Sequence, residues 1–232
     1  MPNAYLADRL PETLPADPMH WADAWLTEAT RQENQRNPNS VTLVTVGQDH
    51  KPTARVVLCK SFLPEPGYAV VYTNYRSQKC REIEGNSNVS LLLHWDYMGR
   101  QVRIGGTAVR SPAAESDAYF ASRDPGSQLG AWGSDQSQPI ESHAALVAQI
   151  RARAAEHGIS LSDDTGTSVA EGSVAVPRPP HWGGLRIWAS SIELWIEGKD
   201  RIHDRALWTR KLTSASEGEF QTTAWIGTRL QP

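Results

Sequence analysis

Three basic side chains at alternating positions, Arg201, His203 and Arg205, form the most suggestive chemical pattern in this sequence. In an extended strand, the two-residue period places all three on one face. Cationic or protonatable groups on one face repel one another unless an anion lies over them. The pattern is typical of a phosphate-binding strand, and it is equally typical of a solvated edge strand protected by charge.

Other groups suited to anion binding recur along the chain. Arg55 and Lys60 bracket an apolar stretch, and residues 77–79 (Ser-Gln-Lys) open a short predicted helix whose free N–H groups favour phosphate. Tyr119 and Arg123 are four residues apart, so they share one face of a predicted helix. Together these groups suit two phosphates, whereas each one alone is compatible with an ordinary surface role.

Composition restricts the possible functions. The 232 residues are 39% apolar and 21% charged, as in a globular protein with a sizeable core. A net charge of −3 gives no general attraction to nucleic acid or anionic membrane, so we expect neither as a partner. The two cysteines lack metal-site spacing, and no leader-like or membrane-spanning apolar run occurs. We therefore expect a reduced, cytoplasmic protein without a metal.

Common catalytic motifs are missing from the sequence. It contains no GxGxxG, GxxxxGK[ST], GxSxG or HExxH segment. His203 and Asp204 are adjacent, but no serine lies on a recognisable nucleophile elbow. Dinucleotide-binding folds, P-loops, serine hydrolases and zinc proteases therefore lose support.

The elements that must position these residues are mostly short strands. A hairpin is predicted from two β-branched runs joined by Gly47-Gln48-Asp49, and other strands follow the same pattern. The predicted strands are 41–46, 53–60, 68–73, 89–95, 101–110, 184–189, 192–196, 201–208 and 220–226. Because no βαβ alternation occurs, we predict a mainly β (α+β) protein, a barrel or sandwich with peripheral helices.

Helix-capping and breaking residues delimit the remaining segments. The predicted helices are 17–36, 77–84, 111–123 and 140–157. Residues 124–138 are predicted to form a polar, glycine-rich loop. We expect a flexible N-terminal segment at 1–18, a single domain at 19–232, and a flexible linker at about 159–175 within it.

One series of segments matches a known family in order and spacing. It includes Arg55-Val-Val-Leu-Cys-Lys60, Tyr72-Thr-Asn74, Ser77-Gln-Lys79, Arg100-Gln-Val102, Tyr119-Phe-Ala-Ser-Arg123, Ser127-Gln-Leu-Gly-Ala-Trp132, Gln136-Ser137, Trp182-Gly-Gly184, Glu193-Leu-Trp195 and Arg201-Ile-His-Asp-Arg205. Over roughly residues 14–232, the chain resembles the pyridoxamine 5′-phosphate oxidase family.

The resemblance implies an antiparallel, Greek-key-like split β-barrel that binds FMN at the interface of a homodimer. It also implies oxidation of pyridoxamine or pyridoxine 5′-phosphate to pyridoxal 5′-phosphate. Oxygen would be the electron acceptor, and hydrogen peroxide would be released. The cofactor would carry the redox step, while the protein supplies orientation and charge.

The resemblance also implies a role for each matching residue. Those similar to the family's FMN contacts are Arg55, Val56, Val57, Leu58, Cys59, Lys60, Tyr72, Thr73, Gln78, Lys79, Gln101, Gln136, Ser137, Trp195 and Arg205. Those similar to the groups that hold the substrate phosphate are Lys60, Tyr119, Arg123 and Ser127. Arg201 and His203 resemble the catalytic groups that bind the substrate ring near the reacting carbon.

Two departures from the family pattern bear on function. Gln78 stands where many relatives have arginine, which predicts FMN binding weaker by about 1 kcal/mol. Residues 1–13 contain no counterpart of the family's Arg-Arg-x-Tyr segment, so closure over the substrate is expected to differ.

Two other functions remain open from the sequence. One is a related flavin oxidase for another ring, such as a phenazine precursor. Tyr119, Arg123 and Ser127 argue against it, because a substrate without phosphate does not need them. The other is a protein that binds FMN or pyridoxal phosphate without turnover.

Overall fold

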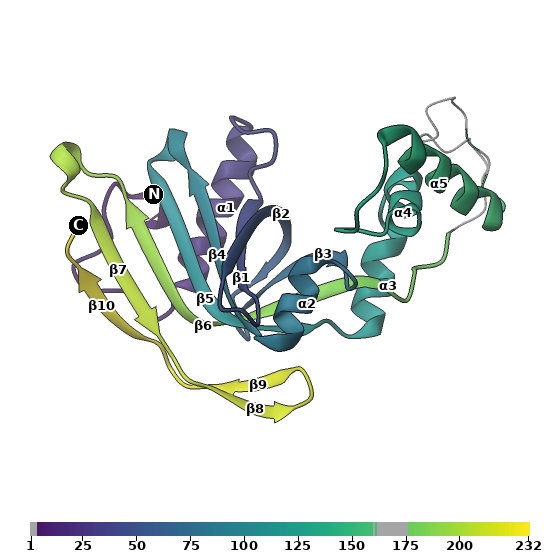
Figure 1. Cartoon of the computed structure of the whole chain (residues 1–232). Helices are drawn as coiled ribbons and strands as arrows, with labels where there is room; N and C mark the ends of the chain where they lie inside the picture. The colour runs from purple at the N-terminus through teal and green to yellow at the C-terminus, as the bar shows by residue number, and fades with distance from the viewer. Residues whose placement is uncertain (1–3, 160, 162–175) are drawn as a thin grey trace. The chain divides into compact units, whose positions relative to one another are not determined.

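The computed structural model describes residues 4–159, 161 and 176–232 (Figure 1). The linker predicted at 159–175 lies outside the described residues, apart from residues 159 and 161. The helices are α1 (Met19–Gln32), α2 (Gln78–Gly85), α3 (Ala113–Ala121), α4 (Pro125–Gly133) and α5 (His143–Glu156), with 3-10 turns η1 (Ala4–Leu6), η2 (Asp96–Met98) and η3 (Lys199–Arg201). In this part of the chain, no helix is long and apolar enough to span a membrane.

The described part of the chain contains ten strands, β1 to β10. They are β1 (Ser40–Val46), β2 (Pro52–Leu63), β3 (Tyr68–Asn74), β4 (Asn88–Trp95), β5 (Arg100–Arg110), β6 (Trp182–Ile196), β7 (Asp204–Thr209), β8 (Leu212–Ser216), β9 (Glu219–Thr222) and β10 (Ile226–Leu230). The predicted hairpin is confirmed, since β1 and β2 pair antiparallel from Ser40↔Leu58 to Val46↔Pro52.

The strands form a closed barrel, which confirms the predicted fold class. Within the described residues, eight strands follow the order β10-β7-β6-β3-β2-β1-β4-β5. Strand β6 also pairs with β5, so β6, β3, β2, β1, β4 and β5 close into a six-stranded antiparallel barrel (Figure 1). Strands β8 and β9 form a separate hairpin.

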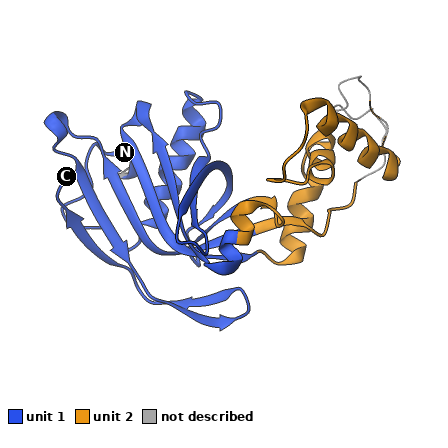
Figure 2. Cartoon of the chain, in the orientation of Figure 1, with its two compact units in different colours: residues 1–71, 82–110, 185–232 blue, residues 72–81, 111–184 orange. Residues whose placement is uncertain are grey.

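The chain divides into two compact units (Figure 2). We call residues 1–71, 82–110 and 185–232 the barrel unit, and residues 72–81 and 111–184 the helical unit. The sequence predicted one domain over 19–232, whereas the boundaries between the units fall within β3, α2 and β6 and at the end of β5.

Alternating burial explains the strands of the barrel unit. Strand β1 buries every second residue, and β4 and β5 repeat this pattern over most of their length. Trp25, Trp95 and Trp188 are among the largest fully buried side chains, each contributing roughly 1.5–3 kcal/mol or more through burial. Gly106 permits a close approach of β5 to β6, because a Cβ at this position would lie 2.1 Å from the carbonyl oxygen of Trp188.

Residues 4–18 make defined contacts within the barrel unit, although the sequence predicted a flexible segment. Leu10 is buried, and its backbone N–H donates to Asp204 Oδ2 at 2.7 Å. Trp25 Nε1 donates to the carbonyl oxygen of Tyr5, and Trp208 Nε1 donates to that of Pro15. Backbone carbonyls without strand partners are satisfied in this way by indole N–H groups.

The predicted loop at 124–138 is wrong in its first part, because residues 125–133 form α4. Asp124 is the N-cap, and its carboxylate accepts the backbone N–H of Ser127 at 2.8 Å. Pro125 occupies the first helical turn, where its missing N–H costs nothing. The glycines were read as loop residues, but Leu129 and Ala131 are buried and stabilise the helix by packing.

Candidate active site

The predicted site residues lie in both units, and each unit presents its own set. In the helical unit, three predicted cofactor residues form one hydrogen-bonded cluster. Lys79 is buried, and its Nζ donates to Thr73 Oγ1 at 3.0 Å, to Ser77 Oγ at 3.0 Å and to Gln136 Oε1 at 2.8 Å. These acceptors carry no net charge, so the cluster holds an ammonium group at the start of α2. An ammonium beside a helix N-terminus suits a phosphate group such as that of FMN.

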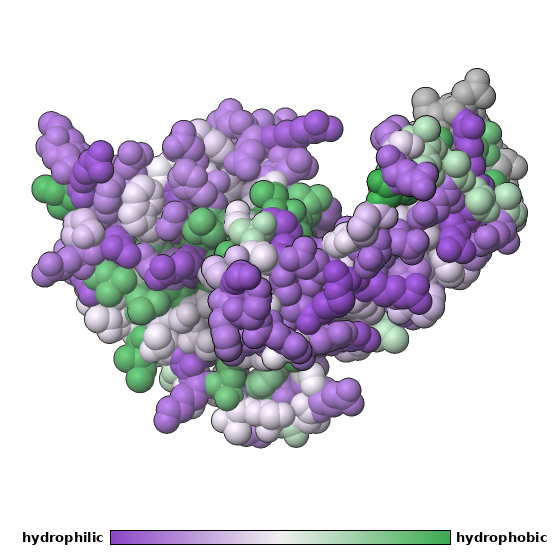
Figure 3. Space-filling model, viewed as in Figure 1, coloured by the Kyte–Doolittle hydropathy of each residue, from purple (hydrophilic) through white to green (hydrophobic). Residues whose placement is uncertain are grey.

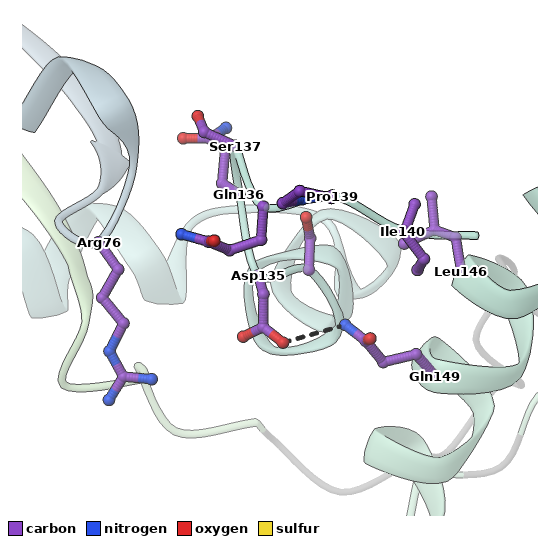
Figure 4. A pocket seen from close by; sticks show the side chains of 10 residues that line it. Arg76, Asp135, Gln136, Ser137, Pro139, Ile140, Leu146 and Gln149 are labelled. Carbon is purple, nitrogen blue, oxygen red and sulfur yellow. Dashed lines mark hydrogen bonds between the residues drawn. The ribbon is translucent and has the colours of Figure 1, made fainter. Parts of the chain in front are cut away.

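A cavity of about 340 Å³ adjoins this cluster within the helical unit (Figure 4). Gln136 and Ser137, both predicted to contact the cofactor, line it together with Asp135 and Gln149. Ser137 has a φ of 69°, in the left-handed region that non-glycine residues seldom adopt. Such strain is common at binding sites, where the surrounding structure holds the residue in place.

Arg76 also lines this cavity, and the sequence analysis did not identify it. Its side chain extends from the loop before α2 toward the segment that carries Asp135 and Gln136 (Figure 4). Gln78, two residues later, is neutral and exposed. The sequence did contain a signal for Arg76, because it is a basic residue only two positions from the neutral Gln78. Arg76 places a cation close to position 78, where many relatives have arginine.

The predicted substrate residues Tyr119 and Arg123 belong to an aromatic cluster of the helical unit. Tyr119 stacks on Tyr72, with ring centroids 3.8 Å apart and planes inclined by 20°. The guanidinium of Arg123 lies over the ring of Trp182, with 4.6 Å from Cζ to the ring centroid. Its Nη1 is buried and has no hydrogen-bond partner among the described residues. Burial lowers the pKa of Arg123, yet an arginine remains cationic at neutral pH.

An unsatisfied buried donor is costly unless a ligand completes its bonding. Arg123 therefore has the character expected of a residue that receives an anion. Ser127 is placed differently, because its backbone N–H caps α4 through Asp124. No hydrogen bond joins Ser127 to Tyr119 or Arg123 in the described part of the chain, whereas Tyr119 and Arg123 both contact the ring of Trp182.

In the barrel unit, three predicted cofactor residues form a row across neighbouring strands. Gln101 on β5 is paired with Trp195 on β6, and Trp195 is paired with Arg205 on β7. Residues paired in register project from the same face of a sheet. The spacing of these residues in the sequence does not predict this row. The row forms because β5 pairs with β6 when the barrel closes.

Glu193 anchors this row and was not identified from the sequence. It is buried, and its Oε1 accepts from Arg205 Nε at 2.9 Å and from Nη2 at 2.7 Å. Its Oε2 accepts from Arg103 Nη2. Two N–H groups of Arg205 thus bind one carboxylate oxygen, which fixes the guanidinium on the strand position paired with Trp195.

The segment at 55–60 forms the middle of β2, and its residues differ in exposure. Arg55 donates to Glu82 Oε2 at 3.1 Å and to Thr53 Oγ1 at 2.6 Å, so the barrel unit itself holds this guanidinium. Val56 and Lys60 are exposed. Cys59 is buried, and burial raises the pKa of its thiol to about 12. Val57 and Leu58 are partly buried.

The predicted strand through Arg201 and His203 is wrong, because β7 begins only at Asp204. Asp200 and Arg201 have φ values of 55° and 65° and belong to η3, which reverses the chain between β6 and β7. A reversal between two paired antiparallel strands requires such a turn. Arg201 is exposed, and it does not share a strand face with Arg205.

His203 nevertheless lies beside a predicted cofactor residue. Its ring centroid is 4.7 Å from that of Trp195. The N–H of Gly198 donates to its Nδ1 at 3.2 Å. This bond places the proton of the neutral ring on Nε2, which can then donate. Asp204 has a structural role, since it accepts from Leu10 N–H and from Arg229 Nη1.

Solved structures with a similar fold place this fold in one class of protein. PhzG from Burkholderia lata 383, in complex with tetrahydrophenazine-1-carboxylic acid, superposes with a TM-score of 0.77 at 26% identity, covering 95% of each chain. A pyridoxamine 5′-phosphate oxidase-related, FMN-binding protein from Nostoc punctiforme shares the fold with a TM-score of 0.64 at 15% identity, covering 94% of this chain. The chain therefore belongs to the class of split-barrel proteins.

Sequence comparisons define the family more closely. Residues 26–155 match the family model described as pyridoxamine 5′-phosphate oxidase, and residues 182–232 match the C-terminal dimerisation region of pyridoxine 5′-phosphate oxidase. The chain is 42% identical over 217 residues to the pyridoxine/pyridoxamine 5′-phosphate oxidase of Roseobacter denitrificans, covering 93% of this chain and 94% of the relative. The corresponding relative from Rubrobacter xylanophilus is 43% identical over 219 residues, covering 93% and 87%. The chain belongs to the pyridoxamine 5′-phosphate oxidase family.

Proposed function

We propose that this protein is an FMN-dependent oxidase that converts pyridoxamine 5′-phosphate, pyridoxine 5′-phosphate or both to pyridoxal 5′-phosphate. Oxygen accepts the electrons and hydrogen peroxide is released. The observation that carries this proposal is the unsatisfied, buried Nη1 of Arg123 beside Tyr119, in the same unit as the cation cluster around Lys79. Two separate groups suited to phosphate match a reaction in which cofactor and substrate each carry one.

The residues fit FMN by the chemistry of their donors. Lys79, with Thr73 and Gln136, suits the phosphate, and Arg76 adds a second cation at the cavity that Gln136 also lines. The row Gln101, Trp195 and Arg205 supplies an amide, an indole face and a guanidinium toward a flavin ring. When bound, FMN supplies the hydride acceptor of the reaction.

The remaining predicted residues act on the substrate. Lys60, Arg123 and Tyr119 bind its phosphate, and Ser127 contributes from the first turn of α4. His203 donates from Nε2 toward the substrate ring, while Arg201 lies in the same turn and contributes positive charge. Of these residues, Tyr119, Arg123 and Ser127 belong to the helical unit, and Lys60, Arg201 and His203 belong to the barrel unit.

We also propose that the protein works as a homodimer. The match to a dimerisation region covers residues 182–232, which include the exposed apolar side chains Ile202 and Ile226, 73% and 70% exposed. Apolar groups also lie among the hydrophilic side chains over β7 and β10 (Figure 3). Exposed apolar patches of this kind are typical of subunit interfaces.

A second candidate is a flavin oxidase for a phenazine precursor. The structural similarity to PhzG favours it. Such a ring acid carries a carboxylate and no phosphate, so it makes weaker use of Arg123 and Tyr119. The two functions therefore differ in whether activity requires a phosphate ester.

The decisive experiment compares substrates on the purified protein. A flavin absorption spectrum, followed by aldehyde and peroxide formation from pyridoxamine 5′-phosphate in air, would support the proposal. Unphosphorylated pyridoxamine is the matched control and should turn over poorly. A yellow protein that is inert toward both B6 phosphates and oxidises a reduced phenazine precursor would select the second candidate. Flavin binding without turnover of either would indicate a binding protein.

A further inference from the structure

Trp182 occupies the centre of the aromatic cluster in the helical unit. It is buried, and its ring is nearly parallel to those of Tyr72 and Tyr119, at 13° and 8° with centroids 5.5 and 6.2 Å away. Phe120 packs edge-on against it at 5.2 Å. Aromatic contacts on several sides leave the indole little freedom to change rotamer.

Arg123 depends on this ring for its position. Its guanidinium lies over Trp182 at 4.6 Å and is 5.7 Å from the ring of Phe120. Within the described part of the chain no carboxylate forms an ion pair with Arg123, and its Nη1 has no acceptor. A guanidinium that lies over an aromatic ring contacts it through its flat face, so its N–H groups stay free to bind an acceptor. In an ion pair, the carboxylate would occupy those N–H groups.

We propose that Trp182 is a positioning residue that presents Arg123 to the phosphate of the substrate. The indole holds the guanidinium in place through a cation–π contact and leaves its donors for the incoming oxyanion. The rings packed around Trp182 form a rigid platform for this guanidinium, whereas Tyr119 stacks most closely on Tyr72, with ring centroids 3.8 Å apart. This inference rests on the proposed function and adds a residue that the family resemblance did not assign to the site.

The platform also explains why an aromatic residue is useful here rather than an acidic one. A carboxylate would hold Arg123 more strongly, but it would repel a phosphate at the same place. Trp182 attracts the cation with a ring quadrupole and carries no net charge. The guanidinium therefore keeps its full charge for the ligand.

The test is the kinetics and ligand binding of Trp182→Leu and Trp182→Phe in the FMN-loaded protein. The leucine variant removes the ring face and should raise KM for pyridoxamine 5′-phosphate about tenfold, with kcat within about twofold of wild type. The phenylalanine variant keeps a ring face and should raise KM only about two- to threefold. Equilibrium binding of pyridoxal 5′-phosphate and of inorganic phosphate should weaken more in Trp182→Leu than in Trp182→Phe. The binding of pyridoxal, which has no phosphate, should be unchanged in both variants.

Trp132→Leu is the matched control. Trp132 is in the same unit and packs against the rings of His157 and His181, whereas the rings that contact the Arg123 guanidinium are those of Phe120 and Trp182. The Trp132→Leu variant should leave KM for pyridoxamine 5′-phosphate unchanged. In the background of Arg123→Ala, Trp182→Leu should have no further effect on KM, because the residue that it positions is gone.

The outcomes separate this inference from the proposed function. If wild type does not oxidise B6 phosphates, the proposed function fails, and the titration with inorganic phosphate alone then decides the role of Trp182. Equal phosphate affinity in wild type and both Trp182 variants would overturn the inference. So would a loss of kcat with unchanged KM, or a further loss in the Arg123→Ala background. If Trp182→Leu does not fold, the Trp182→Phe variant and its double mutant with Arg123→Ala give the same decision.

Discussion

Replacing Glu193 by glutamine should destabilise the barrel unit and loosen Arg205. Glu193 is 2% exposed and accepts two bonds from Arg205 on one oxygen and one bond from Arg103 on the other. The glutamine side chain keeps the shape but turns one acceptor into an N–H₂ donor. That donor would face a guanidinium that can only donate, and the negative charge between the two arginines would be lost.

The expected cost follows from the exposure of each partner. Arg103 is half exposed at 52%, so its pair with Glu193 contributes only about 0–1 kcal/mol. Arg205 is 26% exposed, and loss of its charge-assisted bonds costs about 1.5–3 kcal/mol. Together these contributions predict that Glu193→Gln lowers the free energy of unfolding by about 3 kcal/mol. For a chain of this length, Tm should fall by roughly 6–12 °C.

Thermal unfolding followed by circular dichroism measures this effect. The matched control is Glu84→Gln, whose pair with Arg110 is exposed at both ends, at 58% and 60%. The control should melt within about 2 °C of wild type, because exposed ion pairs contribute little. A Glu193→Gln variant that melts like the control would refute the assignment of a stabilising, Arg205-orienting role to Glu193.

Four further predictions concern the site and its support. Arg123→Ala should raise KM for pyridoxamine 5′-phosphate by about 10–100-fold with kcat little changed, as steady-state kinetics would show. Arg201→Ala should instead lower kcat at least about tenfold, and an equal pattern of losses in both variants would contradict the division of roles. Arg76→Ala should weaken FMN binding about tenfold without affecting riboflavin, measured by flavin fluorescence, whereas replacing the exposed Arg151 of α5 by alanine should affect neither. Hydrogen bonds to the first turn of α4 lower the pKa of Asp124 below its usual 3.8, so this group stabilises the fold above about pH 4 and ceases to do so as pH falls through its folded pKa. The urea midpoint of wild type should therefore exceed that of Asp124→Asn by less at pH 3 than at pH 7.

Local patterns predicted the elements whose signals lie close together in sequence. The β1–β2 hairpin followed from two β-branched runs and one turn, and α2 followed from its length and closing glycine. The start of α4 had a recognisable signal as well, since Asp124 and Pro125 are an N-cap and a first-turn proline. The same Asp-Pro-Gly sequence can also end the preceding helix, and the polar, glycine-rich residues after it favoured that interpretation.

The site was harder to predict where it depends on contacts between distant segments. The alternation of Arg201, His203 and Arg205 is compatible with a strand, but it does not show where the strand begins. Trp182 and Arg123 are separated by almost sixty residues, and their contact arises only from packing in the helical unit. The same holds for the row that joins Gln101 to Trp195, because barrel closure brings β5 to β6.

The burial of Cys59 has a chemical consequence under the proposed function, in which the reaction releases hydrogen peroxide. Peroxide oxidises the thiolate form of cysteine to sulfenic acid, and susceptibility follows ionisation and exposure. Cys59 is 2% exposed with a pKa of about 12, so at neutral pH its sulfur remains protonated and shielded. It lies within β2, in the segment that we expect to contact the flavin. A sulfur atom can therefore occupy this strand through repeated turnovers without becoming a target of the reaction's own by-product.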